Sequence, residues 1–219
     1  RDSKITLFAN TREGGGIRGL TVFLVDADTK GISIGKEEDK MGIRASATAE
    51  IIFEDCFVPD SARVGKEGRG FMIAMQTLQM SRPVVAAISV GIAQAAIEAA
   101  VAYSHHRKQF GVKIATFEMV QQMIADMVMK TEAARILTYK ACVAQMNKDK
   151  KAGLYSAMSK CFASDTAMEV TTTAVQVMGG NGYSRENPVE KYMRDAKIMQ
   201  IYEGTNQVQR LVIANETTF

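Results

Sequence analysis

The chain has 219 residues, of which 47% are hydrophobic and 23% charged, so it can bury a core and form one or two globular domains. A net charge of +3 and the lack of dense Lys/Arg blocks exclude a typical nucleic-acid-binding protein. No apolar run is expected to reach the length of a membrane span, and no signal-peptide pattern opens the chain.

The cysteines and histidines predict no metal site. Cys56, Cys142 and Cys161 are widely spaced and form no CxxC motif, which favours buried, reduced thiols. His105 and His106 are adjacent on a predicted helix, where neighbouring side chains point about 100° apart. We therefore expect end-of-helix residues and no metal ligands.

Residues up to about 62 predict β-structure. Short apolar runs predict strands at residues 4–9, 20–25 and 49–55. Because the first strand begins almost at the first residue, we expect the chain to start inside a sheet and to be a fragment. Residues 14–19 match the GxGxxG pattern, but that phosphate-binding motif requires a following helix. A strand follows here, so we interpret these glycines as a hairpin connection.

From residue 70 onward the apolar residues recur at helical spacing. They predict long helices at residues 71–106, 117–147 and 153–178, and a short last helix that would close the bundle. Pro83 should kink the first helix. The predicted fold class is α+β: a partial antiparallel β-domain over residues 1–67, followed over residues 68–219 by an all-α antiparallel four-helix bundle.

A tight corner near the end of the chain carries one carboxylate. Glu203 stands between Tyr202 and Gly204, after a helix that begins near Pro188 and before the last helix. A poorly solvated carboxylate at such a corner can act as a general base near neutral pH. The plain alternative is an acidic residue that favours a helix N-terminus.

Two other segments combine features suited to a flat, charged ligand. Residues 107–111 place an arginine and an aromatic ring at the end of the first long helix, and the arginine offers donors for a diphosphate. Residues 176–182 end the third helix with glycines that let a ligand approach the backbone. Separately, each segment could also be an ordinary helix C-terminus.

In this order, the three segments resemble the acyl-CoA dehydrogenase family, flavoproteins that oxidise acyl thioesters. The resemblance covers essentially the whole chain and includes residues 40–44, 52–55, 58–59, 65–71, 107–111 and 188–197. It implies that this chain corresponds to the later part of the family's middle β-domain and to its C-terminal four-helix domain.

The resemblance also implies roles for individual residues. Glu203 corresponds to the base that removes the α-proton of an acyl-CoA thioester while a hydride leaves the β-carbon for flavin N5. The substrate would contact Arg82, Tyr202 and Gly204. The residues that correspond to FAD contacts are Arg107, Gln109, Phe110, Gln176, Gly179, Gly180, Thr205 and Gln207.

Three positions distinguish this chain within the family pattern. One branch of the family carries its base immediately before the arginine that corresponds to Arg82; here that position is Ser81, so the resemblance assigns the chain to the Glu203 branch with short- and medium-chain enzymes. Glu118 stands where relatives often carry Gln near the cofactor, and a carboxylate there would repel phosphate. Gln79 stands where many relatives carry an acidic residue.

The family further implies a homotetramer, a dimer of dimers whose subunits share the flavin site, with an electron-transfer flavoprotein as partner. The expected compartment is the bacterial cytoplasm or the mitochondrial matrix. Two alternatives stay open: an acyl-CoA oxidase that passes electrons to oxygen, and a non-catalytic helical scaffold fragment.

Overall fold

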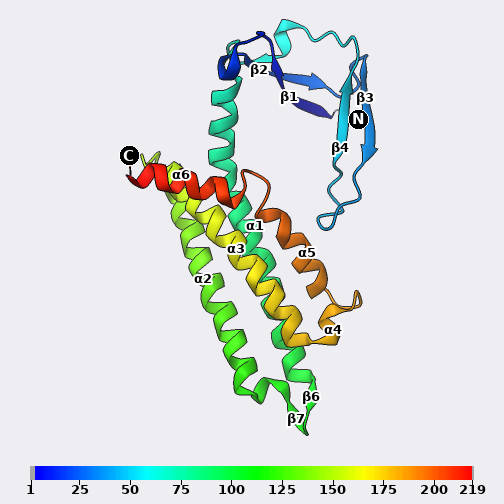
Figure 1. The fold of residues 1–219 in the computed structure, drawn as a ribbon, viewed down its shortest axis with the longest axis vertical. Helices are drawn as coiled ribbons and strands as arrows, with labels where there is room; N and C mark the ends of the chain where they lie inside the picture. The colour runs from blue at the N-terminus through cyan, green and yellow to red at the C-terminus, as the bar shows by residue number, and fades with distance from the viewer. Residues whose placement is uncertain (1–2, 219) are drawn as a thin grey trace. The chain divides into compact units, whose positions relative to one another are not determined.

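The computed structural model describes residues 3–218, which form two compact units. The first unit contains the described residues through Lys40 together with Arg44–Leu78, and the second contains Met41–Ile43 with the described residues from Gln79 onward. Strands occupy the first unit and helices dominate the second (Figure 1). The predicted α+β class is therefore confirmed.

The first unit contains two small antiparallel sheets. One has the strand order β1–β2–β5, and the other pairs β3 with β4. The strands are β1 (Lys4–Asn10), β2 (Leu20–Asp26), β3 (Ile32–Glu37), β4 (Ala49–Phe53) and β5 (Arg63–Val64). The sequence analysis missed β3 and β5, since β5 is two residues long and β3 contains a glycine that weakens its strand pattern.

The β1–β2 hairpin confirms the interpretation of the glycine-rich segment. The strands pair from Lys4 opposite Asp26 to Asn10 opposite Leu20. Their connection contains one turn of 3-10 helix at Gly16–Arg18, and β2 follows directly. No helix N-terminus is available after these glycines to bind a dinucleotide phosphate.

The second unit is an antiparallel helical bundle. Its helices are α1 (Gly70–His106, which enters from the first unit), α2 (Glu118–Met146), α3 (Ala152–Met178), α4 (Gly180–Tyr183), α5 (Val189–Met199) and α6 (Asn206–Thr218). Helices α1, α2, α3 and α5 run side by side with alternating direction, and α6 crosses the bundle (Figure 1). The sequence analysis expected the last helix to close the bundle, but α5 takes the fourth position, and both α5 and α6 pack on α3.

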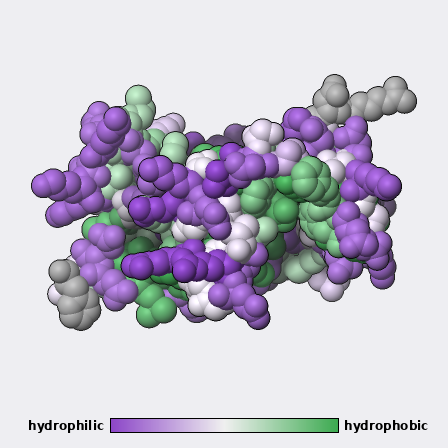
Figure 2. Space-filling model, turned by 90° about the horizontal axis from the view of Figure 1, so that it is seen from above, coloured by the Kyte–Doolittle hydropathy of each residue, from purple (hydrophilic) through white to green (hydrophobic). Residues whose placement is uncertain are grey.

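Small residues allow these helices to approach closely. The core of the bundle is rich in alanine, which lets neighbouring backbones come together, and a few larger side chains fill the remaining space. Its buried residues are Ala93, Ala96, Ile97, Ala100, Met127, Ala167, Val170, Ala174, Val177, Met178, Val189 and Ala196. Hydrophilic residues cover much of the face seen in Figure 2, with hydrophobic residues in smaller patches.

Helix α1 continues through Pro83. A proline has no N–H, so the carbonyl oxygen of Gln79, four residues earlier, loses its normal helical donor. The side chain of Gln145 on α2 replaces that donor: its Nε2 lies 3.0 Å from the Gln79 oxygen and 2.8 Å from Oγ of Ser156 on α3. One amide group thus compensates for the proline and links three helices.

Two expectations from the sequence need correction. Helix α1 contains a window with a mean hydropathy of 1.9, long and apolar enough to cross a membrane by length and composition, so the expectation that no apolar run reaches this length was wrong. The same helix contributes Ala93 and Ala96 to the bundle core, and core helices often pass this test. Of the three cysteines, only Cys161 is buried, and Cys142 is exposed.

Candidate active site and cofactor pocket

The corner that carries Glu203 lies between α5 and α6. The backbone N–H of Asn206 donates to the carbonyl of Gln200 at 3.0 Å, which closes the corner. Glu203 has a φ of 58° and Gly204 a φ of 88°. A left-handed conformation is uncommon for a residue with a side chain, so the surrounding structure must hold Glu203 in place.

The Glu203 carboxylate contacts helix α1. The hydroxyl of Ser81 donates to Oε2 of Glu203 at 2.6 Å, and Arg82 Nε lies 3.5 Å from the Glu203 carbonyl oxygen. Burial lowers the pKa of Arg82, although the charge of Glu203 opposes this shift. Burial, followed by the charge of Glu203, raises the pKa of Tyr202. The four residues predicted for catalysis and substrate contact, from α1 and from the corner, thus lie together.

Three buried polar residues below the corner escaped the sequence analysis. Lys160 on α3 donates to the Gly204 carbonyl at 2.8 Å and to Asn206 Oδ1 at 2.9 Å. Gln209 Nε2 donates to the carbonyls of Glu203 at 3.3 Å and of Gly204 at 3.1 Å. The sequence contained a signal for the burial of Lys160, because Lys160 lies among the small residues on the buried face of α3.

A second site lies at the opposite end of the bundle from α6, next to the hairpin of β6 (Lys108–Gln109) and β7 (Val112–Lys113) (Figure 1). It is a pocket of about 420 Å³. Its lining comprises Tyr103, Arg107, Gln109, Phe110, Ile114, Phe117, Val120, Val177, Met178, Gly179, Gly180 and Asn181. Five of the eight predicted cofactor residues are in this lining.

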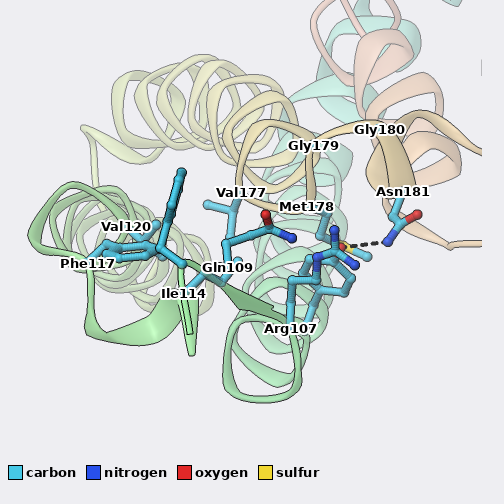
Figure 3. Close-up of a pocket in the computed structure, with 12 residues that line it drawn as sticks. Arg107, Gln109, Ile114, Phe117, Val120, Val177, Met178, Gly179, Gly180 and Asn181 are labelled. Carbon is cyan, nitrogen blue, oxygen red and sulfur yellow. Dashed lines mark hydrogen bonds between the residues drawn. The ribbon is translucent and has the colours of Figure 1, made fainter. Parts of the chain in front are cut away.

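The geometry of this pocket suits a flat anionic ligand. Arg107 and Gln109 rise from the hairpin beside the end of α3 (Figure 3), and Arg107 forms no ion pair within residues 3–218. Phe110 is 93% exposed and contacts Phe117 edge to face. At Gly180, a side chain would meet no atom of the chain within 4 Å, so open space lies over this backbone.

The remaining predicted cofactor residues lie elsewhere. Gln176 is exposed on α3 and is absent from the pocket lining. Thr205 and Gln207 stand at the start of α6, and the Thr205 hydroxyl accepts the N–H of Val208 at 3.3 Å, as an N-cap residue does. Glu118 is exposed in the first turn of α2.

Two family models match the chain. The acyl-CoA dehydrogenase C-terminal domain matches residues 68–218, and the acyl-CoA dehydrogenase middle domain matches residues 2–56. The chain belongs to the acyl-CoA dehydrogenase family. It is a C-terminal portion, since it spans about half the length of the curated relatives it matches.

Among relatives of known sequence, a probable acyl-CoA dehydrogenase of Mycobacterium tuberculosis is 51% identical over 95% of this chain and 54% of its own length. The mitochondrial short-chain specific acyl-CoA dehydrogenase of the mouse, Mus musculus, is 46% identical over 97% of this chain and 51% of its own length. Among solved structures, butyryl-CoA dehydrogenase from Megasphaera elsdenii has a TM-score of 0.94 and 48% identity, covering 96% of this chain and 55% of that protein.

Proposed function

We propose that this chain is the C-terminal portion of an FAD-dependent acyl-CoA dehydrogenase in which Glu203 removes the α-proton of the acyl-CoA thioester. The observation that carries the proposal is the Glu203 carboxylate, held by Ser81 at 2.6 Å beside Arg82 in a left-handed corner. A carboxylate that is anchored and partly withdrawn from water is suited to act as a general base.

The chain's own residues would do three things in this reaction. Glu203 would accept the α-proton on a carboxylate oxygen, Tyr202 would flank the thioester, and Gly204 would leave space beside the substrate. FAD, when bound, supplies the acceptor for the hydride that leaves the β-carbon. Arg82, whose guanidinium lies beside the corner, would contribute positive charge next to the substrate.

Arg107, Gln109, Phe110, Gly179 and Gly180 would hold the diphosphate and adenine side of FAD. Two observations support this assignment: Arg107 forms no ion pair within residues 3–218, and open space lies over the glycine backbone. Gln176, Thr205 and Gln207 would complete the contacts. Because the pocket and the corner lie at opposite ends of the bundle (Figure 1), we propose that each flavin is shared between two subunits of a homotetramer.

The partners and the compartment follow as parts of the same proposal. A solved structure whose subject is the electron transferring flavoprotein of Acidaminococcus fermentans is 51% identical with a TM-score of 0.95, covering 98% of this chain and 56% of that chain. This likeness supports an electron-transfer flavoprotein as the acceptor. The mouse and mycobacterial relatives support the mitochondrial matrix or the bacterial cytoplasm.

We also propose that the boundary between the β-domain and the helical domain lies between residues 67 and 68.

Oxidase chemistry is the second candidate, since a prolyl acyl carrier protein oxidase shares the fold at a TM-score of 0.93 and 30% identity. The curated relatives named as acyl-CoA dehydrogenases are 45–51% identical, which favours the dehydrogenase. Peroxide release in air during turnover of the intact protein separates the two activities.

The test of the proposed base is Glu203→Gln in the intact flavoprotein. The amide cannot accept the proton, so turnover of acyl-CoA should fall below about a hundredth of the wild-type value, as expected for loss of a general base. The flavin absorbance should persist. Glu216→Gln, an exposed change on α6, is the matched control and should keep full turnover. Activity of Glu203→Gln above that level would rule out the assignment.

A further inference from the structure

Lys160 is a fully buried lysine whose hydrogen-bond acceptors are neutral oxygens. Its relative exposure is 0%, and its Nζ donates to the Gly204 carbonyl at 2.8 Å and to Asn206 Oδ1 at 2.9 Å. None of the ion pairs in the described part of the chain includes it. Burial of an ammonium group among neutral partners destabilises a folded protein, and it lowers the pKa of Lys160 to about 8.

The Gly204 carbonyl does not depend on this ammonium group alone for a donor. It also accepts from Gln209 at 3.1 Å. The Ser164 hydroxyl lies 3.2 Å from Asn206 Oδ1, but its single proton has a closer acceptor in the backbone carbonyl of Lys160 at 2.7 Å. Hydrogen-bond satisfaction of the Gly204 carbonyl therefore does not account for a lysine here.

Lys160 contacts the backbone directly after Glu203, at the Gly204 carbonyl. The Glu203 carbonyl is held by Gln209 at 3.3 Å and more weakly by Arg82 at 3.5 Å, and Lys160 holds the carbonyl of the following residue. Charge-assisted hydrogen bonds are roughly twice as strong as neutral ones. Lys160 is the charged group that ties this left-handed corner to the rigid helix α3.

We propose that Lys160 is a positioning residue, which holds the Glu203–Gly204 corner on α3 so that the Glu203 carboxylate stays directed at Ser81. The inference rests on the proposed role of Glu203 for its effect on turnover, but the restraint of the corner is a separate physical claim. A lysine retained at a cost in stability beside a strained residue is typical of a functional site.

The test is Lys160→Met in the intact flavoprotein, with Ser164→Ala as the matched control. Methionine fills a similar volume without charge or donor, while Ser164→Ala removes a buried hydrogen bond to Asn206 and leaves the bond from Lys160 to Gly204. In Lys160→Met we expect kcat to fall about a hundredfold, the effect of a small misplacement of a reacting group, with KM and flavin content little changed. The thermal midpoint should be unchanged or higher.

Amide hydrogen exchange provides a readout that does not depend on activity. The N–H groups of Tyr202 and Asn206, which are bonded within the corner, should exchange faster in Lys160→Met and at the wild-type rate in Ser164→Ala. The proposal would be overturned if Lys160→Met kept the wild-type kcat or the wild-type exchange rates. It would also be overturned if the loss of kcat came with a lower thermal midpoint, or if the variant did not fold. If Glu203→Gln proved active, the proposed function would fail, and the exchange rates would still decide whether Lys160 restrains the corner.

Discussion

Ser81 and Glu203 are far apart in the sequence, yet the serine hydroxyl donates a hydrogen bond to the carboxylate. The 2.6 Å hydrogen bond joins α1 to the corner. By resemblance, Ser81 occupies the position where another branch of the family carries its base. In this chain the Ser81 hydroxyl donates a hydrogen bond to Glu203, the base in our proposal.

Replacement of Ser81 by alanine should therefore slow proton removal without abolishing it. A hydrogen bond to a charged group contributes about 1.5–3 kcal/mol, so we expect kcat to fall by about tenfold or more. Ser81→Thr should keep most of the activity. Ser89→Ala is a suitable control on the same helix, because the Ser89 hydroxyl bonds only its own helix at Val85. Steady-state kinetics at saturating acyl-CoA measures the effect, and equal kcat in Ser81→Ala and wild type would contradict it.

Lys160 makes the stability of the protein depend on pH. Its pKa is about 8 when folded, against an ordinary value of 10.5, so between these values the unfolded chain binds more protons than the folded one. Stability then rises with pH across this window. The thermal midpoint of the wild-type protein minus that of Lys160→Met should increase from pH 8 to pH 10.5. Below pH 7 this difference should be constant. A difference that is flat or falls over that window would contradict the buried charge.

Helix α1 combines a proline with an unbroken helical course. Its length and its buried face are readable from the sequence, but the partner of the Gln79 carbonyl is not. Gln145 supplies that partner from α2, at 3.0 Å. The two residues form a unit in which a side chain of one helix completes the backbone of another.

This unit predicts a coupling between Pro83 and Gln145. Gln145→Ala should lower the free energy of unfolding by about 1 kcal/mol or more through the lost hydrogen bonds. In a Pro83→Ala background the restored N–H can donate to Gln79, so the same change should cost less. A double-mutant cycle from urea unfolding measures the coupling. Equal costs in the two backgrounds would show that Gln145 does not compensate for the proline.

The cofactor pocket belongs to the end of the bundle that also carries the β6–β7 hairpin. Open space over Gly180 and the exposed ring of Phe110 are consistent with our proposal that a ligand and a neighbouring subunit complete this surface. The chain covers about half of its relatives' length.

Arg107→Ala should weaken flavin retention in the intact assembly, because it removes the guanidinium that would pair with the diphosphate. Lys108→Ala is the matched control: Lys108 is the adjacent exposed cation and is absent from the pocket lining. The flavin-to-protein ratio after dialysis measures the effect. Equal retention in both variants would remove Arg107 from the proposed binding site.

The amino-acid sequence was sufficient for the long helices, the β1–β2 hairpin and the family, because these depend on local periodicity, on turn residues and on ordered motifs. It was not sufficient for β3 and β5 or for the fourth position of the bundle. Short strands and alternative helix packings leave no distinct local pattern.

Only the tertiary structure decided how the site is supported. Ser81, Lys160 and Gln145 carry no motif, and each acts through a partner distant in the sequence. A hydrogen bond of 2.6 to 3.0 Å between such residues depends on the packing of whole helices, so no local pattern specifies it. The sequence therefore predicts Glu203 as the candidate base, and helix packing determines which groups hold that residue in place.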